Sequence, residues 1–365
     1  MEKSVEKQRL ECIDIFRGFT MSLMLIASNP GNPANIPAFL KHAEWNGATM
    51  GDFIFPFFVF IMGVVVPISL KNKLEKGISR VKIIAGVLRR SILLFLFGLL
   101  LNGFPTYDLT VIRIPGVLQR IAIVYFCSSL IYILLKSVIK KDLIQIAIQS
   151  LIAVALLFVY YCLLKYVQVP GYDNLVAYVD LKFLKGHLYT PTFDPEGILS
   201  TIPAIGSGLI GGVVAMFLQR KDSHLVKMAV FVCSGIVFII CGELFNVYFP
   251  YNKQLWTSSF VLLTSGSAIL VLAAFYLITD ILKIGKVFAP FKAIGSSAIF
   301  VYFISNLIGI TVWRILPTNY FISITTTYIS PWAHNLDTIV FSVGYATIWI
   351  LIMGILYRQK IYIRL

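Results

Sequence analysis

The sequence predicts an all-α, polytopic integral membrane protein: a helical bundle of about ten transmembrane helices that forms a single domain over residues 1–365. Three observations lead to this fold class. The chain is 58% hydrophobic and only 13% charged, whereas soluble domains are about 45–50% apolar and about 25% charged. Its apolar residues gather in stretches of about 20 residues, the length that crosses a bilayer as a helix. Its basic residues gather between those stretches.

Ten stretches are long and apolar enough to be predicted as transmembrane helices. They cover roughly residues 13–28, 50–70, 84–103, 115–135, 143–164, 197–218, 228–248, 258–279, 293–313 and 338–357. No connection between them is long enough to separate two domains, which is why we expect one transmembrane domain.

The positive charges predict the orientation of the bundle. With the N-terminus in the cytoplasm, the cytoplasmic segments hold 20 Lys and Arg residues and the longer outer segments hold 7. Such an excess is typical of the cytoplasmic side. We therefore expect both termini in the cytoplasm and the protein in the inner membrane of the cell. The net charge of +14 is then a topology signal, so we expect the lipid bilayer and no nucleic acid as a partner.

Three outer connections, 29–49, 165–196 and 314–337, are long and rich in Pro, Asn, Tyr and Trp. We expect them to fold over one face of the bundle. The span that follows the first of them contains Pro56 and Pro67, and a proline inside a helix removes a backbone hydrogen bond. Backbone groups freed at membrane depth are tolerated only against protein or a wet cavity. The second span is therefore predicted to line an interior cavity.

The sixth span carries a helix-start signal and a glycine pattern. Asp194 before Pro195 suits a helix start, with Asp as the N-cap and Pro at the first helical position. The spacing of Gly208 and Gly212 predicts close packing against a neighbouring helix. A backbone wall against a slender ligand is the alternative interpretation.

Several charged residues fall inside the predicted spans, where an ionisable side chain costs about 2.5–3.5 kcal/mol on insertion scales. Asp14 and Arg17 are three residues apart and could pair on one helix face. Arg89 and Arg90 could extend to the cytoplasmic surface or grip an anionic cytosolic ligand, since guanidinium suits phosphate geometry. Arg120 lies too deep for the first option.

For Arg120 the residue types leave two interpretations open. One is a salt bridge inside the bundle, for which Asp52 and Glu243 are candidate partners. The other is contact with a substrate.

Of the four histidines, His42 has the surroundings most typical of a catalytic group. Glu44, Trp45, Asn46 and Asp52 follow it closely, and imidazole titrates near neutral pH, as a general base requires.

The other histidines are predicted to be surface or loop residues. They are His187, His224 and His334. Neither they nor the five cysteines have the spacing of metal ligands, so no metal site is expected.

The run from His42 to Gly63, HAEWNGATMGDFIFPFFVFIMG, resembles the heparan-α-glucosaminide N-acetyltransferase family and its bacterial relatives. Four further segments are similar to that family in the same order: residues 13–18 (IDIFRG), 116–120 (GVLQR), 193–197 (FDPEG) and 252–259 (NKQLWTSS). The resemblance covers nearly the whole chain. Lysosomal members carry an extra N-terminal luminal domain, so we expect here a bacterial relative without it, for which heparan sulfate itself is not the expected substrate.

The resemblance implies an acyltransferase that moves acetyl from cytosolic acetyl-CoA to the amine of an amino sugar on the periplasmic side. Acetyl-CoA is then a donor substrate, and a glucosamine-type sugar or glycan is the acceptor. The resemblance also implies a homodimer. Its active histidine corresponds to His42, and an asparagine shortly before it corresponds to Asn29.

These roles predict a mechanism. His42 either deprotonates the attacking amine or accepts the acetyl group itself, and the sequence leaves both routes open. Asn29 would stabilise the oxyanion, and Asp52 or Glu44 would orient the imidazole.

The remaining candidates are assigned to the two substrates. The nucleotide phosphates of acetyl-CoA are expected at the basic inner rim, near Arg17, Arg89 and Arg90. The acceptor is expected against Glu44, Trp45, Asn46, Arg120 and Trp256.

Three other functions remain as alternatives. A secondary transporter of a small polar solute or sugar suits kinked helices and intramembrane charges, although no inverted repeat is visible. A membrane acyltransferase that acts on sugar hydroxyls has a histidine in its first helix, and none follows Phe19 here before Ser28. A scaffold or sensor without catalysis is the third alternative.

Overall fold

The computed structural model describes residues 10–316, 319–333 and 336–363. Over these ranges the chain is helical and contains no strand. Ten long helices build the bundle: α1 Glu11–Ser28, α2 Met50–Glu75, α3 Arg80–Gly103, α4 Val117–Val138, α5 Asp142–Tyr166, α7 Thr201–Leu218, α8 His224–Asn246, α9 Ser258–Tyr276, α11 Ala298–Ile310 and α14 Asp337–Arg358.

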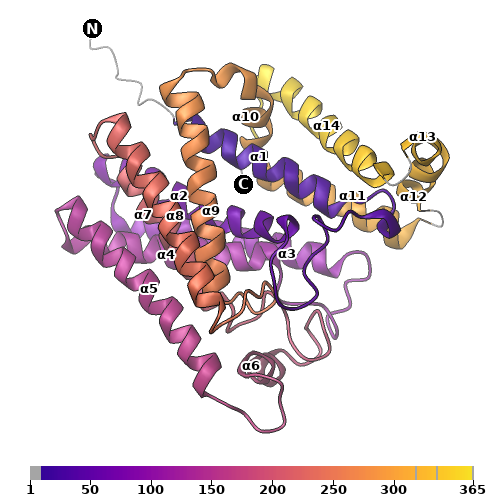
Figure 1. The fold of residues 1–365 in the computed structure, drawn as a ribbon, viewed down its shortest axis with the longest axis horizontal. Helices are drawn as coiled ribbons and strands as arrows, with labels where there is room; N and C mark the ends of the chain where they lie inside the picture. The colour runs from indigo at the N-terminus through magenta and orange to yellow at the C-terminus, as the bar shows by residue number, and fades with distance from the viewer. Residues whose placement is uncertain (1–9, 317–318, 334–335, 364–365) are drawn as a thin grey trace.

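Shorter helical elements lie between them. Four are α-helical: α6 Leu175–Leu184, α10 Ala289–Gly295, α12 Tyr320–Ile324 and α13 Ser330–Ala333. Two are 3₁₀ turns, η1 Pro33–Asn35 and η3 Gly285–Phe288. Three are π-helical, η2 Leu277–Ile281, η4 Thr311–Ile315 and η5 Thr325–Ile329. Figure 1 shows α6, α12 and α13 at the edge of the bundle, outside the long helices.

The predicted fold class is confirmed: the protein is a multi-pass helical membrane protein. Among the described residues, nine helices are long and apolar enough to cross a bilayer. The first predicted span coincides with α1, which is 18 residues long but carries the charged residues Glu11, Asp14 and Arg17. These three charges are more than a typical membrane-spanning helix carries.

The ninth predicted span, 293–313, is not one continuous helix. The chain turns at Ser296 and Ser297, which separate α10 from α11. Two serines in succession favour such a break because their hydroxyls compete for backbone hydrogen bonds.

The core of the bundle forms where α2 and α7 cross. A Cβ added at Gly63 of α2 would lie 1.9 Å from the carbonyl oxygen of Gly208 in α7, and one added at Gly211 would lie 2.2 Å from that of Phe60. Glycine is therefore required for this approach of the two backbones. Close packing, the first interpretation of the Gly208 pattern, describes this contact.

The connections between helices divide into two faces. We call the loop face the one formed by residues 29–49, 104–116, 167–200, 247–257, 316, 319–333 and 336, and the basic face the opposite one. Hydrogen bonds join distant parts of the loop face, such as Asn35 Nδ2 to Asp337 Oδ1 at 3.2 Å and Gly47 N to Tyr251 O at 2.8 Å. The long outer connections therefore fold over one face, as predicted, whereas the side of the membrane they face stays a prediction.

The predicted helix start at Asp194 is wrong. α7 begins at Thr201, with Ser200 as its N-cap. Asp194 is instead held in a turn: its backbone N–H donates to Asp180 Oδ2 at 3.0 Å. A Cβ at Gly197 would lie 2.1 Å from the same oxygen, so the glycine lets this turn close on the Asp180 carboxylate.

Candidate active site

His42 lies on the loop face, in the connection between α1 and α2. Its side chain is 60% exposed, and its Nδ1 atom lies 2.7 Å from Oδ1 of Asp52. Asp52 is fully buried in the first turn of α2. The imidazole is thus anchored on a rigid helix end by one ring nitrogen while the rest of the ring faces outward.

Local sequence explains how Asp52 is placed. Thr49 is the N-cap of α2, and Thr49 and Asp52 form a capping box. Oδ2 of Asp52 accepts hydrogen bonds from Thr49 N at 2.9 Å, Thr49 Oγ1 at 3.1 Å and Ala43 N at 3.2 Å. One oxygen of the carboxylate therefore holds the backbone, and the other is free to face His42.

Lys253, from the connection between α8 and α9, completes the cluster. Its Nζ atom lies 2.9 Å from Nδ1 and 3.1 Å from Nε2 of His42, and 3.3 Å from Oδ1 of Asp52. Burial lowers the pKa of Lys253 below its usual value, although the Asp52 and Glu196 carboxylates act in the opposite direction. We call His42, Asp52 and Lys253 the His42 cluster.

The cluster assigns the protons of the imidazole. A carboxylate only accepts hydrogen bonds, so Nδ1 of His42 carries the hydrogen that points at Asp52. Nε2 then carries the lone pair, and Lys253 Nζ lies beside both ring nitrogens, 2.9 Å from Nδ1 and 3.1 Å from Nε2. This arrangement can accept a proton or an acyl group at Nε2 once the ammonium moves aside.

The residues after His42 form a rim that is tied to the 250–257 segment. The Glu44 carbonyl accepts from Gln254 Nε2 at 2.9 Å, and Asn46 Oδ1 accepts from Asn252 Nδ2 at 3.5 Å. Trp45 is 42% exposed and sets its ring edge against Phe193 at 5.9 Å. Within the described ranges the Glu44 side chain does not contact His42, so of the two predicted orienting carboxylates only Asp52 is in position.

Behind the cluster lie Arg120 and Trp256, both 1% exposed. The Arg120 guanidinium stands 4.9 Å from the centre of the Trp256 ring and donates to Ser200 Oγ. Of the two interpretations of Arg120, the salt bridge is not found: among the described residues, neither Asp52 nor Glu243 pairs with it, and substrate contact stays a prediction. Asp52 is instead committed to the His42 cluster, and Arg120 keeps its charge beside an aromatic face.

A second charged group on the loop face was not predicted. Arg113 forms a bidentate pair with Asp194, at 2.8 and 2.7 Å, and also donates to Glu196. Burial lowers the pKa of Arg113, but the two carboxylates raise it above its usual value overall. Burial, and to a lesser degree Asp194, raises the pKa of the neighbouring Asp180.

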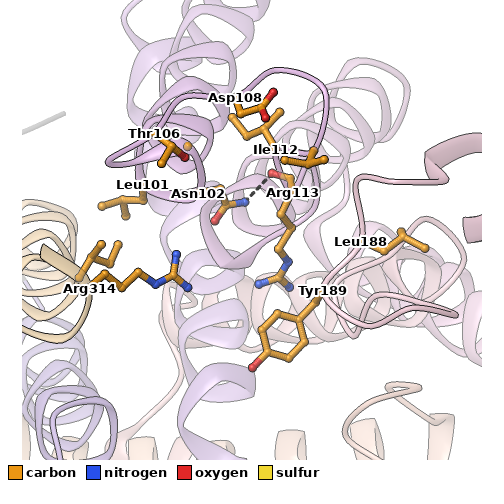
Figure 2. A pocket seen from close by; sticks show the side chains of 12 residues that line it. Leu101, Asn102, Thr106, Asp108, Ile112, Arg113, Leu188, Tyr189 and Arg314 are labelled. Carbon is orange, nitrogen blue, oxygen red and sulfur yellow. Dashed lines mark hydrogen bonds between the residues drawn. The ribbon is translucent and has the colours of Figure 1, made fainter.

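Arg113 also lines a pocket of about 420 Å³ on the loop face. Figure 2 shows the guanidinium groups of Arg113 and Arg314 reaching into this pocket from different elements, with Tyr189 beside Arg113. Asn102 donates from Nδ2 to the Arg113 carbonyl at 2.8 Å and fixes the wall. His42, Asp52 and Lys253 are not among the lining residues, so this pocket is distinct from the His42 cluster.

Asn29 lies elsewhere on the loop face. It is 4% exposed, its Nδ2 donates to Leu25 O at 3.0 Å, and its carbonyl accepts from Ser342 Oγ at 3.0 Å. In the part of the chain that the structure describes, none of these contacts reaches His42. The oxyanion role of Asn29 therefore stays a prediction and needs a rearrangement of the loop face.

The three arginines predicted to bind the nucleotide are spread over the bundle. Arg17 lies 3.9 Å from Asp14, as predicted, and donates to Gly295 O at 3.3 Å. Arg89 is exposed. Arg90 is half-buried, with its guanidinium 5.3 Å from the centre of the Tyr125 ring.

The interior between the two faces contains buried polar atoms. Side-chain atoms without a hydrogen-bond partner among the described residues are buried on α3 and α4: Arg90 Nε, Ser91 Oγ, Gln119 Nε2, Arg120 Nε and Nη1, Ser128 Oγ and Ser129 Oγ. We call these atoms the polar file. The predicted interior cavity is not open behind Asp52, because Phe55, Trp256 and Arg120 fill that space.

Sequence reasoning missed Lys253 as a site residue. A signal was present, because lysines are sparse in the segments predicted to lie outside and Lys253 is the one basic residue between residues 247 and 257.

Three other expectations from the sequence concern His187, His334 and a metal site. His187 binds a backbone carbonyl, that of Ile112, at 2.8 Å, and His334 lies outside the described residues. Within the described ranges, His, Cys, Asp and Glu side chains form no group of three that could hold a metal ion.

Comparison with known proteins agrees with the resemblance found in the sequence. Residues 10–249 match the family described as "Domain of unknown function (DUF5009)". The heparan-alpha-glucosaminide N-acetyltransferase of Mus musculus is 25% identical over 410 aligned positions, which cover 97% of this chain and 60% of the mouse protein.

The Homo sapiens protein of the same name is 28% identical over 419 positions, covering 97% of this chain and 59% of the human protein. The chain thus spans about 60% of the length of these relatives.

Proposed function

The chain belongs to the DUF5009 family, and from its similarity to N-acetyltransferases and the geometry around His42 we propose that it is a transmembrane acetyltransferase. It moves acetyl from acetyl-CoA to the amine of an amino sugar. The donor is cytosolic, the acceptor is a glucosamine-type sugar on the periplasmic side, and the membrane is the inner membrane of the cell.

One observation carries this proposal: an exposed imidazole fixed by a buried carboxylate on the loop face. Nδ1 of His42 is held 2.7 Å from Asp52, and Nε2 is directed away from that carboxylate. A base whose tautomer is fixed by a carboxylate can remove a proton from an attacking amine or form an acyl-imidazole. Both routes use the same atom, Nε2.

The reaction begins when the acceptor, arriving as an ammonium ion, displaces Lys253 from Nε2 and gives its additional proton to solvent. By the direct route, the neutral amine attacks the thioester carbonyl carbon, Nε2 takes the remaining amine proton, and the C–S bond breaks; sulfur leaves with the bonding electrons and takes up a proton. By the covalent route, Nε2 first attacks the thioester and the C–S bond breaks, with sulfur leaving and taking up a proton. The amine then attacks the acetyl carbon, the C–Nε2 bond breaks with its electrons returning to Nε2, and the amine proton goes to Nε2 or solvent. Asp52 stabilises the imidazolium in either route.

The polar file supports an entry path for the donor from the basic face. A buried polar atom without a partner costs about 1–3 kcal/mol, so a run of such atoms is best explained by a polar occupant. Arg90 lies about 15 Å along α3 from Arg80, the first residue of that helix. We propose that Arg90 contacts the donor and that Trp256 and Arg120 move aside when its acetyl group reaches His42.

A secondary transporter is the second candidate, since a charged interior also suits solute passage. Counterflow of a labelled amino sugar in proteoliposomes, measured beside acetyl-CoA consumption, distinguishes the two functions. Exchange of intact sugar without thioester consumption would favour the transporter.

The direct test uses purified full-length protein in detergent with labelled acetyl-CoA and a panel of amino sugars. We expect N-acetylated product with at least one glucosamine-type acceptor and stoichiometric release of free thiol. Absence of product and of thiol release with every acceptor would refute the proposed function.

A further inference from the structure

The His42 cluster already contains a primary amine, that of Lys253. Its Nζ atom lies 2.9 Å from Nδ1 and 3.1 Å from Nε2 of His42, and 3.3 Å from Oδ1 of Asp52. A base and a carboxylate at these distances are what an amine acceptor needs in order to lose a proton and attack. Lys253 therefore occupies the position that the acceptor's amine would take.

Burial distinguishes this lysine from an ordinary surface lysine. The side chain is 21% exposed, and burial lowers its pKa, so a larger fraction of Nζ is the neutral nucleophile at a given pH. Lys41 provides the contrast: it is in the loop that carries His42, is exposed, and makes no side-chain hydrogen bond or ion pair within the described residues.

We propose that Lys253 marks the amine subsite and is itself acetylated on Nζ when no acceptor amine has displaced it. This inference rests on the proposed function, because it requires the acetyl thioester to reach the His42 cluster. It adds a modification site and a position for the acceptor nitrogen, between Nε2 of His42 and the Asp52 carboxylate.

The transfer balances as a simple acyl exchange. Neutral Nζ attacks the acetyl carbonyl carbon, a C–N bond forms, and the C–S bond of the thioester breaks. The sulfur leaves with the electron pair and takes up the proton that Nζ gives to His42. If Nζ starts as an ammonium, its additional proton goes to solvent, and the products are Nε-acetyllysine and free coenzyme A.

The product is an amide, so it does not pass its acetyl group on to a sugar under the conditions of transfer. Acetylation also removes the positive charge beside His42 and enlarges the side chain at the place where the acceptor binds. Self-acetylation is thus a dead end that reduces sugar acetylation in proportion to the modified fraction. A saturating acceptor protects against it because both amines compete for one subsite.

The experiment measures acetylation of Lys253 by peptide mass spectrometry after incubation of the full-length protein with acetyl-CoA. Lys41 serves as the internal control for uncatalysed acetylation. Glucosamine is the competing amine, His42→Gln removes the base, and Lys253→Arg confirms the assignment of the mass shift. We expect Lys253 to be acetylated about tenfold or more faster than Lys41, and slowly in His42→Gln or with glucosamine present.

The outcomes separate this inference from the proposed function. Turnover of glucosamine by a protein whose Lys253 stays unmodified in the incubation without acceptor would overturn the inference and leave the function intact. Equal rates at Lys253 and Lys41, or no effect of His42→Gln, would also overturn it, since the acetylation would then be uncatalysed. Acetylation of Lys253 that depends on His42, without turnover of any sugar, would support the inference and contradict the proposed acceptor class. If neither Lys253 acetylation nor sugar turnover occurs, both the inference and the proposed function are refuted.

Discussion

The His42 cluster and the polar file differ in how far their polar atoms are hydrogen-bonded. On the loop face, both oxygens of Asp52 are occupied, and Lys253 and His42 are within hydrogen-bond distance of each other. In the interior, Arg90 Nε and two nitrogens of Arg120 have no hydrogen-bond partner among the described residues.

The His42 cluster is therefore preorganised, whereas the atoms of the polar file lack hydrogen-bond partners. A cluster whose hydrogen bonds are all made holds its geometry before substrate arrives, which favours chemistry. Buried groups that lack partners lower stability and are explained most simply by a ligand that satisfies them. We therefore assign transfer to the loop face and donor contact to the interior.

The largest expected effect is that of His42→Gln. Loss of the base or nucleophile should lower acetyl transfer by about 10²–10⁴-fold, whereas folding should be unchanged because the side chain is 60% exposed. Rates of acetyl-CoA consumption, with thermal unfolding measured in parallel, check this. The matched control is His187→Gln, a loop-face histidine outside the His42 cluster. Equal losses in both variants would contradict the assignment.

Asp52→Asn should have the next largest effect. An amide can donate to Nδ1 of His42 and so favour the wrong tautomer, which should lower kcat by about 100-fold or more. The control is Asp337→Asn, because Asp337 is also a fully buried aspartate at the start of a loop-face helix and binds Asn35 and Ser330. Both variants should lose stability, but only Asp52→Asn should lose kcat in the folded fraction.

The sequence predicted the loop face better than the interior. The spans and the contact of Asp52 with His42 could be anticipated, since apolar length and a ten-residue spacing are local signals. The false helix start at Asp194 arose because local capping preference competes with a tertiary ion pair, here with Arg113. Such a pair joins residues 81 positions apart and leaves no local pattern.

The same reasoning explains Lys253 and Arg120. Lys253 meets His42 across 211 positions, a separation that no periodicity reports. For Arg120 the sequence left a salt bridge and substrate contact open, and the structure shows its guanidinium on the Trp256 ring. The cavity predicted from the prolines of α2 is filled behind Asp52 by side chains, and the positions of prolines do not determine how side chains pack.

Arg90→Met tests whether the polar file contacts the donor. If Arg90 contacts the donor, its loss should raise the KM for acetyl-CoA about tenfold, with a smaller change in kcat. Arg89→Met is the matched comparison, because Arg89 is adjacent on α3 but exposed; its effect should be clearly smaller. Equal effects would mean that general positive charge, and not the polar file, attracts the donor.

The pH dependence of Lys253 acetylation tests the electrostatics of the His42 cluster. Burial lowers the pKa of Lys253, so neutral Nζ forms at lower pH than it does for a lysine in an unfolded peptide. The rate of Lys253 acetylation, measured by peptide mass spectrometry, should therefore rise at lower pH in the folded protein than in a peptide of residues 250–257. Coincident profiles would contradict the burial of Lys253 in the His42 cluster.

The smallest expected effect is on stability, in Arg120→Met. Replacing a buried charge by an apolar side chain of similar length is often neutral or stabilising by about 1–4 kcal/mol. Thermal unfolding in detergent should therefore show an unchanged or raised Tm, while acetyl transfer falls. A large loss of Tm would mean that Arg120 is a structural residue and has no function in the polar file.

The central claim is that acetyl passes from a donor on the basic face to an amine at His42 on the loop face. Proteoliposomes of uniform orientation, with labelled acetyl-CoA supplied only to the basic face and glucosamine only to the loop face, test it directly. The account predicts labelled N-acetylglucosamine on the loop-face side with wild-type protein and none with His42→Gln. Product that forms only when both substrates are on the same side would contradict it.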